Sequence, residues 1–174
     1  MFRVEAFEAV GGFLPHLAAG EEPELCLRLR EKGWVIWRLQ AEMTKHDAAI
    51  TRFGQWWQRS VRGGSGYAQG YTLHRRSPHP IWQRQMVRSV FWGGILPASL
   101  LMAGPFYPMV FFGALLYPLQ IFRIASNRGV SDPQSWTYAF FVMLAKFPEF
   151  EGIVRFYWRH LLGKRTRLIE YKNR

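Results

Sequence analysis

The first part of the chain alternates apolar and polar residues with helical spacing. Residues 2–9 predict a short helix that ends at Gly11-Gly12, where glycine allows backbone conformations that other residues avoid. Residues 23–32 predict a second helix, because Pro23 suits a first turn and Gly33 suits the position after the last turn. The pattern therefore predicts two short helices separated by a glycine turn.

The pattern then changes twice before the middle of the chain. Trp34-Val35-Ile36-Trp37 is aromatic and β-branched, which predicts a strand. Residues 52–62 return to helical spacing, and Gly63-Gly64-Ser65-Gly66 predicts a break in that helix. Residues 63–88 are aromatic and basic, which indicates an interfacial linker.

A long uncharged stretch follows. From Ser89 to Phe122 there is no charged residue and no histidine, and one membrane helix needs about 20 apolar residues. Gly104-Pro105 predicts a turn near the middle. We therefore expect residues 89–125 to form an apolar helical hairpin, either transmembrane or re-entrant because each helix is short. The alternative is a helical hairpin buried in a soluble core, but soluble helices seldom lack charge over so long a run.

Charge supports a membrane location. The net charge is +11 and aromatic residues are 17% of the chain. Arg84 and Arg88 precede the uncharged stretch, and Arg123 and Arg128 follow it. Basic residues at both ends favour a hairpin whose two ends are cytoplasmic, at the inner (plasma) membrane. Because these residues flank an apolar run and do not form one soluble face, we do not expect nucleic-acid binding.

The last region continues this pattern. Residues 126–174 predict interfacial amphipathic helices and a basic tail, since the apolar run Trp136–Ala145 is too short for a membrane span. Cys26 is the only cysteine, so no disulfide forms within the chain. It lies beside Leu25 and Leu29 on the inward side of the predicted helix, which indicates packing.

Candidate chemistry lies at the start of the second helix. Glu21 and Glu22 precede Pro23, and a helix dipole favours the ionised form of a carboxylate at this end. Such a carboxylate can take a proton from an attacking hydroxyl. The alternative is that both residues are ordinary N-terminal helix charges, which many helices have.

Four motifs in this region resemble those of a known family. They are Gly11-Gly12-Phe13, Gly20-Glu21-Glu22, Leu25-Cys26-Leu27-Arg28-Leu29 and Gly33-Trp34. In type and spacing they resemble the acceptor half of family-2 glycosyltransferases with the GT-A fold. The resemblance implies an α/β fragment, a partial GT-A domain over residues 1–62, followed by an all-α membrane-associated region. It places Glu22, with Glu21 beside it, at the position of the family's general base.

The resemblance also implies substrates and a cofactor. The donor would be a nucleotide sugar, and the acceptor a lipid-linked sugar or polysaccharide. A divalent cation, Mn²⁺ or Mg²⁺, would bind the diphosphate, with His46 as a candidate ligand. The family's usual Asp-x-Asp metal motif is absent from the chain. The alternative for His46 is a local hydrogen bond.

A further segment resembles membrane-bound processive synthases. Gln55-Trp56-Trp57-Gln58-Arg59 is similar to their Gln-x-x-Arg-Trp signature, although here the tryptophans precede the arginine. Trp56 or Trp57 could offer a flat face to a sugar ring, and a nearby arginine could contact phosphate; the candidates are Arg52, Arg59 and Arg62. The alternative is an amphipathic helix on the membrane surface.

The acceptor-half resemblance leaves the donor site unassigned. Residues 1–47 are too few to build a nucleotide-binding sheet. We therefore expect no transferase activity from this chain alone, and a separate donor-binding chain as a partner. The alternative function is a small non-enzymatic membrane anchor or adaptor whose basic flanks bind anionic lipid.

Overall fold

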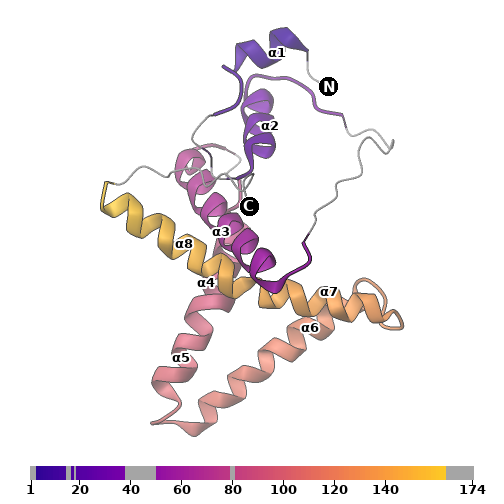
Figure 1. Cartoon of the computed structure of the whole chain (residues 1–174), viewed down its shortest axis with the longest axis vertical. Helices are drawn as coiled ribbons and strands as arrows, with labels where there is room; N and C mark the ends of the chain where they lie inside the picture. The colour runs from indigo at the N-terminus through magenta and orange to yellow at the C-terminus, as the bar shows by residue number, and fades with distance from the viewer. Residues whose placement is uncertain (1–2, 15–16, 18, 38–49, 79–80, 164–174) are drawn as a thin grey trace.

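The computed structural model describes residues 3–14, 17, 19–37, 50–78 and 81–163. Within these ranges all regular structure is helical (Figure 1). The elements are α1 (Val4–Ala9), α2 (Glu21–Glu31), α3 (Phe53–His74), α4 (Gln83–Val90), η1 (Phe91–Ile95), α5 (Leu96–Ala103), η2 (Pro108–Leu115), α6 (Leu116–Ser126), α7 (Pro133–Leu144) and α8 (Lys146–Leu161). Here η1 is a π-helical turn and η2 a 3₁₀ helix.

The expected α/β fold is wrong. Trp34–Trp37 forms no strand, and no sheet occurs among the described residues. The segment instead follows α2, with the Trp34 amide bonded to the Leu29 carbonyl at 2.9 Å. Trp34 and Ile36 pack against a small core that contains Leu25 and Leu29, whereas Trp37 is 83% exposed. A β-propensity run needs a neighbouring strand to pair with, and the described residues offer none.

The two predicted N-terminal helices are present. The first is α1, and Gly11 and Gly12 after it have φ of 75° and 69°, as the glycine turn requires. The second, α2, starts two residues before the predicted position and ends at Glu31. Gly33 follows it with φ of 81°, which matches its expected place after the helix. Local signals therefore located both elements.

The expected break at Gly63–Gly66 is also wrong, because α3 continues through it. The glycines let α8 approach α3 closely. A Cβ on Gly64 would lie 1.9 Å from the Glu149 carbonyl oxygen, and one on Gly152 would lie 1.9 Å from the Val61 carbonyl oxygen. Ser65 Oγ donates to the Gly152 carbonyl at 2.9 Å across the same contact. This crossing of α3 and α8 forms the centre of the molecule (Figure 1).

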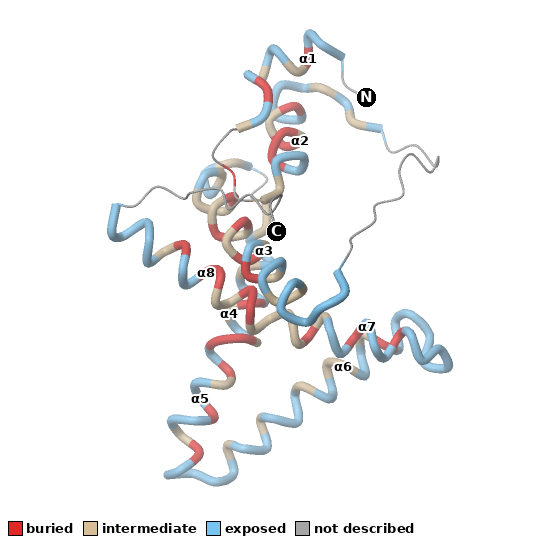
Figure 2. The backbone as a smooth tube through the Cα atoms, viewed as in Figure 1, coloured by how far each residue is buried: buried red, intermediate tan, exposed pale blue. Residues whose placement is uncertain are grey.

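The uncharged stretch forms the expected helix–turn–helix. The first arm continues from α4 through η1 into α5, and the second runs from η2 into α6, with a turn at Gly104–Tyr107. Two helices, Gln83–Ala103 and Pro108–Ser126, are long and apolar enough to cross a membrane. The arms diverge from the turn and extend away from the α3–α8 crossing (Figure 1). Most of their surface is exposed (Figure 2).

The base of the hairpin is tied to the α3–α8 crossing. Gly93 and Gly94 of η1 lie against α8, where a Cβ on Gly93 would be 2.1 Å from the Lys146 carbonyl oxygen. Tyr117 of α6 donates its hydroxyl to the Trp92 carbonyl at 2.6 Å, which joins the two arms. The second arm also packs on α7, whose N-terminus is capped by Asp132 through the Gln134 amide at 3.0 Å.

Two neighbouring glycines of α3 test the close approach of α8. We expect Gly64→Ala to lower the free energy of unfolding by about 1–3 kcal/mol, because the new methyl group must push α8 away. Thermal unfolding followed by circular dichroism in detergent micelles measures the change.

Gly63→Ala is the matched control. Its Cβ would meet no atom within 4 Å, so replacing a helical glycine should raise the stability by up to about 1 kcal/mol. Equal melting temperatures for the two variants would contradict the glycine-mediated contact.

Candidate functional site

Glu21 and Glu22 are the first residues of α2, and both are exposed. Gly20 before them has φ of 86°, and a Cβ there would lie 2.3 Å from the indole ring of Trp82. Trp82 immediately precedes α4 and also lies against Gly70 of α3. The positive end of α2 therefore carries two carboxylates in water, at a turn that rests on an aromatic ring.

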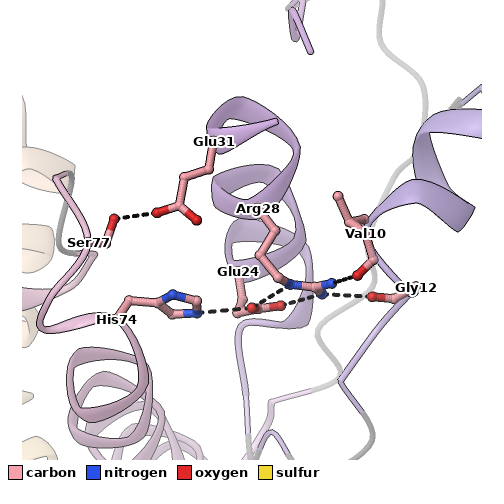
Figure 3. Close-up of polar contacts among 7 residues, drawn as sticks. All are labelled: Val10, Gly12, Glu24, Arg28, Glu31, His74 and Ser77. Carbon is pink, nitrogen blue, oxygen red and sulfur yellow. Dashed lines mark hydrogen bonds and ion pairs between the residues drawn. The ribbon is translucent and has the colours of Figure 1, made fainter. Parts of the chain in front are cut away.

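A third acidic residue of the same helix is fully buried. Glu24 is 0% exposed, and its carboxylate accepts two bonds from Arg28, from Nε and from a terminal nitrogen, each at 2.7 Å. His74 Nε2 lies 3.0 Å from the other side of the same carboxylate (Figure 3). Both oxygens of Glu24 are thus paired, as a buried carboxylate requires.

Arg28 extends this network to the glycine turn. Its two terminal nitrogens donate to the carbonyl oxygens of Val10 and of Gly12, the latter at 2.7 Å (Figure 3). The Arg28 side chain is only 16% exposed. The network therefore joins the residues after α1, the middle of α2 and the last residue of α3. We refer to Glu24, Arg28 and His74 as the buried triad.

The buried triad fixes the rotation of α2 about its axis. At about 100° per residue, Glu22 lies about 200° around the helix from Glu24, and Glu21 lies about 60° from it. Because Glu24 faces α3 through His74, Glu22 is on the side of α2 that faces away from α3. An acceptor hydroxyl would have to reach Glu22 from that outer side.

The predicted sugar platform lies elsewhere. Trp57 Nε1 donates to Glu151 of α8 at 3.0 Å, and Trp56 packs edge-on against Phe141 of α7 at 5.4 Å between ring centroids. Both are near the start of α3, whereas the α2 turn meets α3 through Ala19 and Gly66. Trp56 and Trp57 are therefore about 14 Å from Gly66 along the axis of α3. The structure therefore does not bring Trp56 and Trp57 to Glu22.

The candidate arginines are in the same N-terminal half of α3. Arg52, Arg59 and Arg62 are all exposed, and the Arg52 backbone amide donates to Gln55 Oε1 at 3.1 Å. Phosphate binding by these side chains stays a prediction. It would take place beside the tryptophans and away from the acidic turn of α2.

The candidate metal site depends on one residue. His46 lies outside the described residues. Within the ranges that the structure describes, no three His, Cys, Asp or Glu side chains gather where a metal ion could bind. The divalent cation therefore stays a prediction from the resemblance.

A second buried polar cluster lies at the base of the hairpin. Glu149 of α8 accepts a bond from Ser89 Oγ at 2.5 Å and pairs with Lys146 Nζ at 2.6 Å. Ser89 is fully buried. Burial, and secondarily the charge of Glu149, raise the pKa of Tyr67 above its usual value. Every partner of this cluster is internal, so its geometry indicates a structural joint between α4 and α8.

Two cavities occur in the described parts of the molecule away from the acidic turn. One, of about 600 Å³, lies between η1 and α6 and is mostly apolar, with Arg123, Gln120 and Asn127 as its main polar residues. The other, of about 310 Å³, lies between α1 and α2 and is lined by Ala9, Val10, Arg28, Glu31 and Lys32. Neither is lined by Glu21 or Glu22.

Sequence reasoning missed the buried triad. Glu24 and Arg28 are four residues apart on a helix, a spacing that favours an ion pair, and this signal could have been recognised. His74 is 50 residues from Glu24, and no local pattern links them. The buried carboxylate of α2 thus fixes the helix, while its neighbours Glu21 and Glu22 are exposed.

No protein-family model, no curated protein and no solved structure matches this chain. The resemblance to family-2 glycosyltransferases therefore rests on the quoted residues. The structure places Glu21 and Glu22 in the first turn of α2, with the glycine motifs on either side of the helix.

Breaking the buried triad should release α2. We expect Glu24→Gln to raise the rate of hydrogen exchange at the α2 amides. The free energy of local opening should fall by about 3 kcal/mol, because the largely buried Arg28 loses its charged partner. Exchange measured by mass spectrometry in micelles reports this opening.

Glu22→Gln serves as the comparison on the same helix. Because Glu22 is exposed, its substitution should change the free energy of opening of α2 by no more than about 0.5 kcal/mol. Similar protection of α2 in both variants would show that the triad does not fix this helix.

Proposed function

We propose that this chain is the membrane-anchored acceptor side of a glycosyltransferase, with Glu22 as the general base. The observation that carries the proposal is the contrast within α2. Glu24 is fully buried and paired, whereas Glu21 and Glu22 are exposed at the positive end of the same helix. A rigid helix that keeps two unburied carboxylates at its N-terminus suits a base that must meet a substrate.

In the proposed reaction, the acceptor hydroxyl approaches the outer side of α2. The Glu22 carboxylate takes the hydroxyl proton while the acceptor oxygen attacks the anomeric carbon of the donor sugar. The bond from that carbon to the nucleotide diphosphate breaks, and the diphosphate leaves with the electron pair. The helix dipole helps Glu22 stay ionised before each turnover, and the buried triad keeps its backbone in place.

The donor must bind to a part that the described residues do not form. They contain no sheet, so we propose that a donor-binding chain or segment docks beside α1 and α2. The exposed residues Val35 and Trp37 after α2 are apolar surface on that side of the molecule and could contribute to such contact.

The membrane placement is part of the proposal. The hairpin is exposed and apolar, and Arg84, Arg88, Arg123 and Arg128 lie near its two open ends. This arrangement supports a cytoplasmic position for those ends at the inner membrane. A lipid-linked or polysaccharide acceptor would then be available close to the base of the hairpin.

One observation favours the alternative, a non-enzymatic membrane anchor or adaptor. Neither cavity described above is lined by Glu22, and the central α3–α8 crossing uses none of the candidate catalytic residues. An adaptor would need only the hairpin, the basic flanks and an exposed apolar surface for its partner.

Substitution of the two exposed acids separates the alternatives. The full chain, and its Glu22→Gln and Glu21→Gln variants, would be expressed in the native organism from which the chromosomal copy has been deleted. Transfer of radiolabelled sugar from a panel of nucleotide sugars to lipid and polymer fractions would be measured in isolated membranes. We expect Glu22→Gln to lower chain-dependent transfer by about 10²–10⁴-fold, the usual contribution of a general base.

Glu21→Gln should retain most of the transfer, which would separate the role of Glu22 from the general charge of the turn. Full transfer by Glu22→Gln would remove Glu22 from the mechanism. Membranes that contain the chain but show no chain-dependent transfer would favour the adaptor.

A further inference from the structure

The turn between the two arms of the hairpin is apolar, and its side chains are exposed. Phe106 and Met109 are each 79% exposed and Tyr107 is 69% exposed. The turn carries no charged residue, and the nearest ones along the chain are Arg88 and Arg123. A turn that emerged into water on the far side of a membrane would not need so much exposed apolar surface.

Most backbone amides of the turn are also paired within the hairpin. The amides of Gly104, Phe106, Tyr107 and Val110 donate to carbonyls one turn earlier, at 2.8–3.1 Å. Pro105 and Pro108 have no amide hydrogen to satisfy. Six of the seven residues from Gly104 to Val110 therefore present no free N–H group. Because each unpaired backbone polar group costs several kcal/mol in hydrocarbon, the pairing of these amides lowers the cost of placing the turn there.

The helices Gln83–Ala103 and Pro108–Ser126 have the length of membrane spans, but their uncharged parts alone are shorter than the hydrocarbon core. From Ser89 to Ala103 the first arm rises about 22 Å at 1.5 Å per residue. The second, with η2 at 2.0 Å per residue, rises about 26 Å from Pro108 to Phe122. The hydrocarbon core is about 30 Å thick. Because the arms diverge from the turn (Figure 1), they cannot both follow the membrane normal, and their depth is smaller still.

The first arm cannot be lengthened by including α4. Gln83, Arg84, Gln85 and Arg88 of α4 are exposed, and the helix packs against α3 and α8. Ser89, at the end of α4, is bonded to Glu149 of the buried polar cluster. These contacts keep α4 with the polar body of the molecule, so the apolar arm begins near Ser89.

The geometry points to a re-entrant anchor: residues 89–122 enter one leaflet, turn at Gly104–Tyr107 inside the hydrocarbon and return to the same surface. The lipid acyl chains of that leaflet are the partner of the exposed arms and turn. The inference rests on the membrane placement in the proposed function and does not depend on the glycosyl transfer.

The space between the arms fits this arrangement. The cavity of about 600 Å³ between η1 and α6 is open and mostly apolar, and Trp92 and Phe122 are among its lining residues. Arg123, on the same cavity, is near the end of α6. At the surface of one leaflet, an arginine in that place meets lipid phosphate while the apolar wall meets acyl chain.

Cysteine accessibility tests the inference on the full chain. In a Cys26→Ser background, Met109→Cys places one thiol at the turn, and Val130→Cys places one in the exposed connection between α6 and α7. A membrane-impermeant maleimide is added to sealed vesicles of each orientation, with and without detergent. We expect Val130→Cys to react from one side only, and Met109→Cys to react at least about tenfold more slowly from both sides until detergent is added.

The contrary outcomes are distinct. Reaction of Met109→Cys from the side opposite to Val130→Cys would show a transmembrane hairpin and overturn the inference, while the membrane placement would stand. Recovery of the chain in the soluble fraction without detergent would overturn the membrane placement itself.

A charge placed at the turn provides a second measurement. Met109→Lys should reduce the membrane-bound fraction relative to Val130→Lys, because only the first would put an ammonium group into hydrocarbon. Equal membrane-bound fractions would contradict a turn inside the bilayer.

Discussion

The close contact of α3 and α8 is the interaction on which the remaining structure depends. Gly64 and Gly152 allow the two backbones to approach so closely that a methyl group at either position would overlap the other helix. Ala68, Ile153 and Phe156 are buried along the same crossing. From this centre, α8 contacts the base of the hairpin, and α3 carries the N-terminal helices. Dispersion between closely packed backbones, together with burial of a modest apolar core, thus organises both the apolar hairpin and the polar parts.

The N-terminal helices are attached by polar contacts. Leu25 and Leu29 form a small core with Ala6, which is little apolar area for an independent unit. The buried triad supplements it by joining α2 to α3 and to the glycine turn. The main effect of this pairing is to fix the orientation of α2. Any rotation of the helix would leave the Glu24 carboxylate buried without its partners, which is costly. That orientation decides which acids of α2 meet solvent.

Sequence reasoning was accurate where the deciding forces are local. The presence of α2, the role of Gly33 and the turn at Gly104-Pro105 all follow from backbone preferences of single residues. It failed where a distant partner decides. Trp34–Trp37 has the composition of a strand, but the described residues offer no strand for it to pair with. Gly63–Gly66 predicts a break in the helix when taken alone, whereas in the structure these glycines allow α8 to pack against a continuous α3. The same limit applies to the candidate site. Glu21 and Glu22 were correctly expected at the start of a helix. No local sequence pattern, however, predicts that Trp56 and Trp57 lie far from them or that His74 contacts Glu24.

Trp82 connects the polar and apolar halves at one point. Its backbone has φ of 59°, the one positive value at a non-glycine among the described residues, and its ring occupies the space beside both Gly20 and Gly70. The residue also stands directly before α4, where the first arm originates. A side chain added at either glycine would therefore displace the indole, and with it the start of α4 relative to the acidic end of α2. Selection that preserves the direction of the hairpin would thereby also preserve two glycines that belong to other elements.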